Sequence, residues 1–560
     1  MAVGFIIKCS GTMIELLIPY ILTHILKNVV VTESLSKVLF WGMLMLVCAG
    51  SACVCNIVAN RMAAKVSKYF SEKMRKDLFE KTIKLSAKQT DHYSIPSLES
   101  RITTDTYNVH NFIGMMQRMG VRAPILLLGG IIITMIMDSF LSLVMVAILP
   151  FIFITVFTIS KKGIPLYSGV QKSVDDMVRV VREDTQGIRV IKALSKNDYE
   201  NRRYDKVNLK LSKNELHAGT IMGSVNPIMT MLMNFGITAV VAMSALRVSK
   251  GLSSPETVIA FMQYFTLISM AMMSVSRMFV MYTKCAASAN RIAEVLNSPT
   301  DLEVIKSNEN TIIDSDAHIV FKDVSFSYIG KTNQLEDISF SLKKGGTLGI
   351  IGATGSGKST LIKLLLRFYD TTDGQIFING KDIRTIPKDE LTNMFGVVLQ
   401  NDFLYADTIE ENIIFGRNIS HEDVVKAAKI AQADSFITSF SDGYDHMLSS
   451  KATNISGGQK QRILISRAIA AHPDILILDD SSSALDYKTD ANLRVALKQN
   501  MKDSTIITVA QRVSSIKDCD IIIVLDHGKI IGYGKHEQLL DTCTEYKEIS
   551  DSQMGGALID

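Results

Sequence analysis

The chain has 560 residues, 47% of them hydrophobic, and a net charge of +4. Its mean hydropathy of +0.20 is high for a soluble protein, and so small a positive charge gives no reason to expect nucleic-acid binding. Seven cysteines without a Cys-x-x-Cys motif predict neither a disulfide framework nor a metal site. The long apolar runs all precede residue 300, and the remainder resembles an ordinary globular domain.

Six segments of the first half are predicted to be membrane-spanning helices, because a bilayer core needs about 20 apolar residues per helix. They lie near residues 3–26, 38–59, 112–136, 139–159, 221–246 and 256–282. Asp138 and Ser139 leave room only for a tight external turn between the third and the fourth.

The polar connections after the second and fourth spans are long and rich in lysine and arginine. The positive-inside rule therefore predicts that both connections, and both chain termini, lie in the cytoplasm. Residues 67–85 place apolar side chains at helical spacing without Pro or Gly, which predicts that the spanning helices continue into the cytosol. The alternative is a disordered basic loop. The apolar positions are Phe70, Met74, Leu78, Phe79 and Ile83.

The pattern changes after Ser298 and Pro299, which predict the end of the last long helix. From His318 onward, HIVFKDVSFSY and ISFSLKKGGTLGIIG are typical of β-strands. We therefore expect a transmembrane domain over 1–297, a linker over 298–317 and a second, strand-containing domain over 318–560, whose motifs indicate its function.

The string GATGSGKST fits the phosphate-binding loop pattern and lies between a strand-like run and a helical run, the context that this motif requires. Backbone N–H groups of such a loop wrap phosphates at a helix N-terminus, its lysine reaches the β- and γ-phosphates, and its serine hydroxyl holds Mg²⁺. The sequence thus predicts ATP or GTP binding. The loop residues are Gly352, Ala353, Thr354, Gly355, Ser356, Gly357, Lys358, Ser359 and Thr360.

Two further motifs follow. ILILDD is a buried strand ending in acids, which places Asp479 to orient the Mg²⁺ shell. ISGGQ, at residues 455–459, precedes the helical run QKQRILISRAI. With these motifs, essentially the whole chain resembles an ATP-binding-cassette exporter half-transporter. The resemblance implies an α-helical membrane domain, with six spanning helices and long cytoplasmic extensions, fused to an α/β phosphate-loop nucleotide-binding domain.

The resemblance also implies roles for individual residues. Tyr328 matches the aromatic residue that stacks on adenine, although it also suits a strand aromatic packed in the core. Gln400 matches the loop glutamine that contacts Mg²⁺ and the membrane-domain interface. The signature residues close on the ATP of a partner cassette, so a working site needs a dimer, and the loop ending at Asp486 contacts the other subunit. The signature residues are Ser456, Gly457, Gly458 and Gln459.

Two segments of the membrane half match the family's coupling segments, which touch the cassette. The first is HYSIPSLESRITTDT, and the second is EDTQGIRVIKALSKNDYENRRYD. In the second, we expect a short coupling helix near Asn197–Asp205. Surface turns are the alternative at individual positions.

The chain departs from the family pattern at its catalytic positions. Asp480 stands where a glutamate usually polarises the attacking water, and Gln511 stands where a histidine is expected. The shorter carboxylate is drawn back by about an ångström, which can cost roughly a hundredfold in rate. In addition, Ser449–Ala452 replaces the family's G-E-x-G. These changes predict a weakened ATP site and hence one subunit of a heterodimeric exporter.

We therefore expect ATP-driven export of a hydrophobic or amphipathic substrate across a bacterial cytoplasmic membrane, with ATP and Mg²⁺ as cofactors and a second half-transporter as partner. A homodimer with slow hydrolysis and an ATP-gated channel or regulatory subunit are the alternatives. Methionine-rich spans suit a cavity for a small molecule, lipid or peptide, but also ordinary lipid-facing packing. Lys8 and Glu15 are functional candidates within the first span, or they snorkel to the interface.

Overall fold

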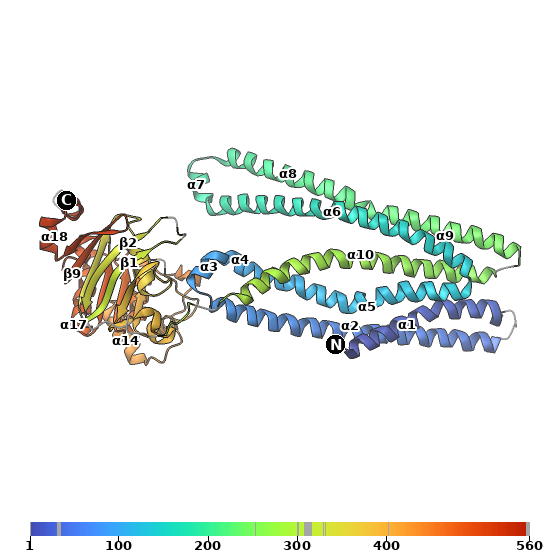
Figure 1. The fold of residues 1–560 in the computed structure, drawn as a ribbon, viewed down its shortest axis with the longest axis horizontal. Coiled ribbons are helices and arrows are strands. Elements are labelled where there is room, and N and C mark those ends of the chain that lie inside the picture. The colour runs from blue at the N-terminus through green and yellow to red at the C-terminus, as the bar shows by residue number, and fades with distance from the viewer. Residues whose placement is uncertain are drawn as a thin grey trace. The chain divides into compact units, whose positions relative to one another are not determined.

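The computed structural model describes residues 2–30, 35–251, 254–299, 302–306, 316–328, 330, 332–400 and 402–555. It divides into two compact units: Met1–Lys84 with Tyr93–Ser298, and Leu85–His92 with Pro299–Asp560. The first unit is helical and the second is α/β, which confirms the predicted fold class (Figure 1). The predicted boundaries of the domains remain predictions, since most of the proposed linker lies outside the described residues.

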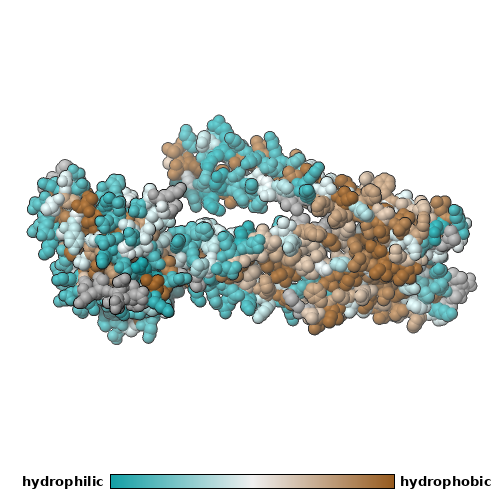
Figure 2. All heavy atoms as spheres, in the orientation of Figure 1, coloured by the Kyte–Doolittle hydropathy of each residue, from teal (hydrophilic) through white to brown (hydrophobic). Residues whose placement is uncertain are grey.

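Long helices make up the first unit. They are α1 (Ala2–His24), α2 (Leu35–Ile83), α5 (Thr106–Met137), α6 (Ser139–Gln186), α8 (Asn197–Gly223), α9 (Val225–Ser249) and α10 (Pro255–Asn297), with the short helices α4 (Ile95–Ser100) and α7 (Ile188–Ala193) between them. The short helix α3 (Ala87–Tyr93) belongs to the second unit except for its last residue. Within the described residues, six helical stretches are long and apolar enough to cross a membrane. Hydrophobic residues gather over one end of this helical unit and polar residues over the other (Figure 2).

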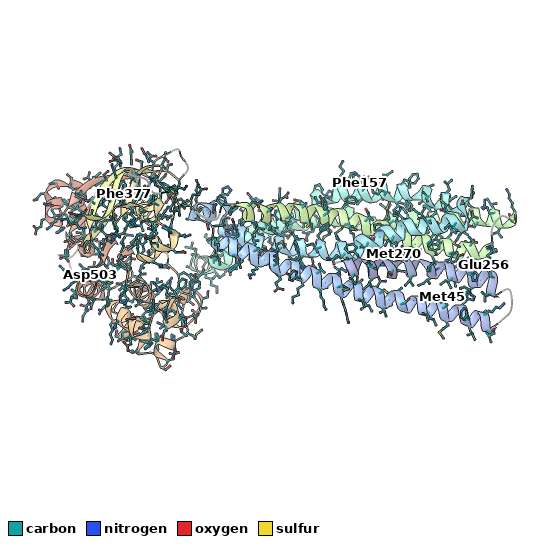
Figure 3. All side chains as sticks on the ribbon, turned by 60° about the horizontal axis from the view of Figure 1, so that its bottom comes forward. Met45, Phe157, Glu256, Met270, Phe377 and Asp503 are labelled. Atoms are coloured by element: carbon teal, nitrogen blue, oxygen red, sulfur yellow. The ribbon has the colours of Figure 1, made fainter. Side chains whose placement is uncertain are left out.

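Five of the six stretches have 43 to 53 residues, about twice what a bilayer requires, which confirms the predicted long extensions. Helix α5 packs along α10, α1 along α2, and α6 along α8. Figure 3 shows the side chains of the apolar end, with Met45, Phe157 and Met270 labelled. Asp138 forms the predicted tight turn: its side chain accepts a hydrogen bond from the Phe140 N–H at 3.1 Å and thereby caps α6.

Polar side chains join distant helices of this unit. Asp105, which is buried, accepts hydrogen bonds from the Arg291 Nε at 2.8 Å and from the Ser288 hydroxyl at 2.9 Å, both on α10. Lys8 is also buried and donates to the Asn56 side chain at 2.7 Å. The Lys8 ammonium group thus lies against an amide of α2 inside the helical unit, which supplies it with a polar partner.

Residues 67–83 are helical, as predicted, and within this segment Leu78 is buried whereas Ile83 is 67% exposed. One expectation about the polar half of these helices needs correction. The short helix of the second coupling segment is α7, Ile188–Ala193, and not Asn197–Asp205, which begins α8. Ser195 ends the short helix by adopting a positive φ of 50°, a conformation that helical periodicity does not predict.

The second unit contains two sheets. The first, in the order β2-β1-β4-β5, is antiparallel, and the second, in the order β10-β9-β3-β8-β7-β6, is parallel except for β10. The strands are β1 (Ala317–Phe326), β2 (Leu335–Lys343), β3 (Thr347–Gly352), β4 (Asp373–Ile378), β5 (Lys381–Asp382), β6 (Phe395–Val398), β7 (Ile475–Asp479), β8 (Thr505–Val509), β9 (Ile521–Asp526) and β10 (Lys529–Gly534).

Helices cover the parallel sheet and contribute to its cores. The α-helices of this part are α11 (Lys358–Leu365), α12 (Lys388–Asn393), α13 (Ile409–Ile414), α14 (His421–Ile430), α15 (Asp434–Ile437), α16 (Gly457–Ile469), α17 (Tyr487–Asn500), α18 (His536–Thr542) and α19 (Thr544–Gly555). Strands β3 and β7 lie inside the sheet and are almost wholly buried, as apolar strands of parallel sheets are. Because these strands run parallel, the loops that follow their carboxyl ends lie at the same edge of the sheet, which is where ligands bind in open α/β sheets.

Candidate functional site

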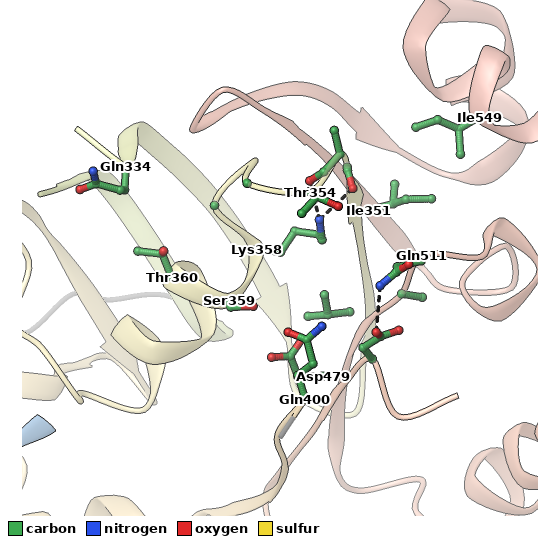
Figure 4. Close-up of a pocket in the computed structure, with 17 residues that line it drawn as sticks. Gln334, Ile351, Thr354, Lys358, Ser359, Thr360, Gln400, Asp479, Gln511 and Ile549 are labelled. Carbon is green, nitrogen blue, oxygen red and sulfur yellow. Dashed lines mark hydrogen bonds between the residues drawn. The ribbon is translucent and has the colours of Figure 1, made fainter. Parts of the chain in front are cut away.

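A cavity of about 500 Å³ lies at this edge of the parallel sheet (Figure 4). Its volume falls in the range of small-molecule sites. Most of the phosphate loop lines it, together with Gln400, the two acids Asp479 and Asp480 at the end of β7, and Gln511. Residues from four predicted motifs, separated by up to 159 positions in the chain, are thus gathered around one space.

The phosphate loop depends on glycine at its end. Gly357 immediately precedes α11 and has a φ of 106°, a left-handed conformation that L-amino acids avoid. A side chain there would also bring a Cβ within 2.7 Å of the Leu335 side chain and 3.0 Å of the Gln334 carbonyl. Glycine therefore allows the strand to turn directly into a helix whose free N–H groups face the cavity.

Lys358 is folded back onto its own loop. Its Nζ donates to the carbonyl oxygens of Gly352 at 2.8 Å and Ala353 at 2.7 Å. Burial lowers the pKa of the Lys358 ammonium, while the charges of Asp479 and Asp480 act in the opposite direction. A nucleotide phosphate would provide a stronger, anionic acceptor for the same ammonium group.

The two acids at the end of β7 differ in their surroundings. Asp479 is 5% exposed, and burial, reinforced by the charge of Asp480, raises its pKa. Burial raises the pKa of Asp480 as well, but hydrogen bonds from Gln511 and Gln400 and the positive charges of Lys358 and Arg512 oppose the shift. Because burial and mutual repulsion disfavour the ionised forms of these two carboxylates, a cation bound at this point of the cavity would stabilise them.

The two residues that depart from the family pattern contact each other. Gln511 Nε2 donates to Asp480 Oδ2 at 2.9 Å (Figure 4). Asp480 itself has a φ of 53°, and its N–H donates to the Val509 carbonyl at 2.9 Å, which ties it to β8. The carboxylate that would orient a water is thus engaged by a neutral amide, which supplies a hydrogen bond but no positive charge.

Oxygen donors suitable for Mg²⁺ line the same cavity. The Ser359 hydroxyl, the Asp479 carboxylate and the Gln400 amide are all present, and hard oxygen ligands are what Mg²⁺ prefers. Among the described residues there is no cluster of three or more His, Cys, Asp or Glu side chains that would hold a metal alone. The chemistry of the donor set therefore fits an ion that is shared with bound phosphates.

Tyr328, the predicted adenine contact, does not line this cavity among the residues described. Its ring packs edge-on against Phe326, with ring centroids 4.8 Å apart, and against Tyr369 at 5.1 Å. It nonetheless stays 38% exposed, and its hydroxyl lies 3.3 Å from that of Thr360, a phosphate-loop residue. Tyr328 thus combines aromatic packing with partial exposure beside the loop, and the Lys363 ammonium lies 5.7 Å from its ring centroid.

The signature residues form a separate helix start. Ser456 Oγ accepts a hydrogen bond from the Gln459 N–H at 3.3 Å, and the Gln459 side chain accepts from the Ser456 N–H at 2.9 Å, which is a complete capping box for α16. None of residues 456–459 lines the described cavity. A Cβ on Gly458 would lie 3.1 Å from the Ala484 carbonyl, so this helix start adjoins the loop that ends at Asp486.

Asp486 also serves the local fold. It caps α17 by accepting hydrogen bonds from the Thr489 N–H at 2.9 Å and from the Thr489 hydroxyl at 2.8 Å. Hydrogen bonding to this backbone N–H and hydroxyl holds the pKa of Asp486 below its ordinary value. Asp486 is therefore not part of the cavity, and its predicted role lies at a dimer contact.

Comparison with known proteins agrees with this geometry. Residues 1–272 match the family model described as ABC transporter transmembrane region. Residues 335–483 match a second family model, described as ABC transporter. YfiB of Bacillus subtilis, named as an ABC transporter ATP-binding protein, is 33% identical over 99% of this chain and 96% of its own length. The chain belongs to the ABC transporter family.

Other relatives extend this finding. MT1311 of Mycobacterium tuberculosis, also named as an ABC transporter ATP-binding protein, is 31% identical over 100% of this chain and 96% of its own length. The solved structure of a bacterial Atm1-family ABC exporter with ATP bound superposes with a TM-score of 0.84, at 23% identity, and covers 98% of each chain. At this identity the match establishes the ABC exporter fold. The chain is thus a multi-pass membrane protein with an ATP-binding cassette.

Several residues around the cavity carry no recognisable motif. Gln334 and Ile549 both line it, although the second is nearly 200 residues from the phosphate loop. Ile549 lies on α19, the C-terminal helix, and sequence reasoning gave that segment no function. No signal in the sequence would have identified it, because a single isoleucine on a short helix has no chemical pattern.

Proposed function

We propose that this chain is one half of an ATP-driven exporter for a hydrophobic or amphipathic substrate, and that its own ATP site hydrolyses slowly. The observation that most directly supports slow hydrolysis is the Gln511–Asp480 hydrogen bond of 2.9 Å beside the phosphate loop. It pairs a shortened carboxylate with a neutral amide at the point where a water would be activated for attack on the γ-phosphate.

ATP would bind with its phosphates on the α11 N-terminus and the Lys358 ammonium. Ser359, Asp479 and Gln400 would hold Mg²⁺, which supplies charge neutralisation on the phosphate oxygens when bound. Asp480 would orient the attacking water from a position drawn back by about one methylene, and Gln511 would donate a hydrogen bond without adding charge. Both features favour binding over hydrolysis at this site.

The signature supports a dimer. The Ser456 and Gln459 N–H groups donate to each other's side chains. Gly457 and Gly458, by contrast, lie at the α16 N-terminus outside the described lining of the cavity, where their N–H groups would face the γ-phosphate of another cassette. We propose that this partner is a different half-transporter, which carries the glutamate and the histidine that this chain lacks. Ser456–Gln459 would then complete the faster site on the partner.

A second cavity, of about 470 Å³, supports the substrate class. It lies within the membrane unit between α1, α9 and α10. Apolar side chains such as Met262 and Met270 line it, and the polar side chains of Glu15 and Gln263 also contribute to the lining. Glu15 pairs with Arg122 of α5, whose Nη2 lies 2.6 Å from Glu15 Oε1. An intramembrane ion pair beside flexible methionines suits a molecule with an apolar body and a polar group.

The test uses the full-length chain in proteoliposomes, alone and with its partner half-transporter. We expect slow ATP hydrolysis from this chain alone, fast hydrolysis and uphill substrate transport from the pair, and little effect of Asp480→Asn on the pair. Robust hydrolysis by this chain alone that Asp480→Asn abolishes would contradict the slow-site and heterodimer proposal and favour a homodimer. Ion conductance without uphill transport would instead favour a channel.

A further inference from the structure

The C-terminal helix α19 reaches the loop that carries Gln511. Gln553 Nε2 donates to the Gln511 carbonyl at 2.8 Å, and Gln553 Oε1 accepts from the Val513 N–H at 2.8 Å. One carboxamide therefore holds two peptide groups on either side of Arg512. Because a carboxamide carries a donor and an acceptor in a fixed plane, this two-point contact fixes both the distance and the orientation of the loop.

The backbone groups that Gln553 contacts have no partner in a regular element. Strand β8 ends at Val509, and Val513 is the first residue of a short 3₁₀ helix, Val513–Ser515. The first N–H groups of a helix lack intrahelical acceptors. Gln553 thus satisfies an amide that the local fold leaves open, at a loop where neither strand nor helix determines the backbone position.

Helix α19 is firmly seated, so it can act as a reference point for the loop. Tyr546 on this helix is fully buried and belongs to an apolar cluster that contains Ile351 and Ala510, two residues that also line the nucleotide cavity. The Tyr546 hydroxyl lies 2.7 Å from His536 Nδ1 on α18. Ile549, one turn further along α19, reaches the cavity itself, and Figure 4 shows it on its helix near Gln511.

We propose that Gln553 is a positioning residue for the ATP site: it holds the loop so that the Gln511 side chain stays on Asp480. The chain of contacts runs from Gln553 to the Gln511 backbone, and from the Gln511 side chain to Asp480 Oδ2 at 2.9 Å. Gln553 touches neither the cavity nor the phosphate loop among the described residues, so it acts only through Gln511. This inference rests on the proposed role of the Asp480–Gln511 pair.

The first test measures the contact directly, by hydrogen exchange at the Val513 amide in the full-length protein. Gln553→Ala should speed this exchange by about fivefold or more, since it removes one hydrogen bond. Gln553→Glu keeps the acceptor and should preserve much of the protection of Val513, although its carboxylate faces the Gln511 carbonyl. Ser552→Ala is the matched control, because the Ser552 hydroxyl bonds only to Ile549 O of its own helix, at 2.9 Å.

The second test separates positioning from general support by single-turnover ATP hydrolysis. Gln553→Ala should lower the rate about fivefold and leave the apparent affinity for ATP within twofold. In a Gln511→Ala background, the same substitution should have no further effect, because the side chain that it positions is gone. Ser552→Ala should change neither quantity.

Two results would overturn the proposal. One is unchanged exchange at Val513 in Gln553→Ala, which would mean that the contact does not hold the loop. The other is an equal loss of rate from Gln553→Ala with and without Gln511, which would mean a purely structural role. If the protein fails to transport substrate or has fast intrinsic hydrolysis, the proposed function fails, while both measurements on Gln553 keep their meaning.

Discussion

The phosphate loop and the signature each begin a helix of the second unit, but the first N–H groups of the two helices find different partners. At α11, a left-handed Gly357 turns the strand into the helix, and the free N–H groups face a cavity that contains the chain's own acids. At α16, Ser456 and Gln459 cap each other and do not belong to the described lining of that cavity. In the proposed function, the first helix start binds the chain's own ATP, whereas the second acts on a ligand held by the partner.

Breaking the first helix start should have the largest effect. Lys358→Ala removes the ammonium group that lies against the loop carbonyls, and we expect the affinity for ATP to fall roughly 10- to 100-fold, because a charge-assisted hydrogen bond is lost. Titration of the purified chain with a fluorescent ATP analogue measures this. Lys381→Ala, on β5 and outside the described lining of the cavity, is the control and should bind nearly normally.

Breaking the second helix start should affect hydrolysis and not binding by this chain. Ser456→Ala is expected to lower the ATP turnover of the assembled dimer about tenfold or more, with unchanged ATP affinity of the isolated chain. Ser420→Ala is the matched control, since Ser420 caps α14 in the same way, accepting from the Asp423 N–H at 3.2 Å. Both variants should melt slightly lower, so an equal loss of turnover in both would refute a specific role for the signature.

Replacing Asp480 and Gln511 with the residues that the family usually carries should speed ATP hydrolysis at the chain's own site. Asp480→Glu combined with Gln511→His extends the carboxylate and adds a side chain that can carry charge, so we expect hydrolysis at the chain's own site to rise about tenfold. Single-turnover hydrolysis by the isolated chain provides the measurement. Asp480→Asn should remove what remains of the activity. A restored pair that is no faster than the parent would argue that these two positions do not limit the site.

The smallest expected effect is on thermal stability, which depends on pH through the raised pKa of Asp479. The pKa of Asp479 is raised above 3.8 in the folded state, so its ionised form is less favourable in the folded than in the unfolded chain. This penalty appears as pH rises above 3.8 and is complete above the raised value. At pH 7, Asp479→Asn should therefore raise Tm by about 2 °C without nucleotide.

The same variant should lose most of the additional stabilisation that Mg²⁺ with ATP gives the parent protein. Differential scanning fluorimetry across pH 4 to about 8 tests both statements, and Asp526→Asn, at the end of β9 in the same sheet and half-exposed, serves as control. A lower Tm for Asp479→Asn at pH 7 would contradict the sign of this argument.

Much of the molecule follows from local sequence. Six apolar stretches of sufficient length, strands around HIVFKDVSFSY and a glycine loop between strand and helix predict both units, because each signal is periodic or chemically specific within about 20 residues. The failure is also local. The sequence predicts the short coupling helix near Asn197–Asp205, but it is Ile188–Ala193, and Ser195 with its positive φ separates it from α8. Backbone conformation at one residue is not encoded in periodicity.

The sequence by itself predicted nucleotide binding through Gly352–Thr360 and the membrane-spanning helices, and it showed Asp480 and Gln511 at positions where the family usually carries other residues. Only the tertiary structure decided that those two side chains contact each other, and that Gln553, from the last helix, forms hydrogen bonds with the backbone of Gln511 and Val513. The reason is physical: a motif records which chemistry is present, whereas contacts between residues 31 or 42 positions apart depend on how the sheet and its helices bring them together.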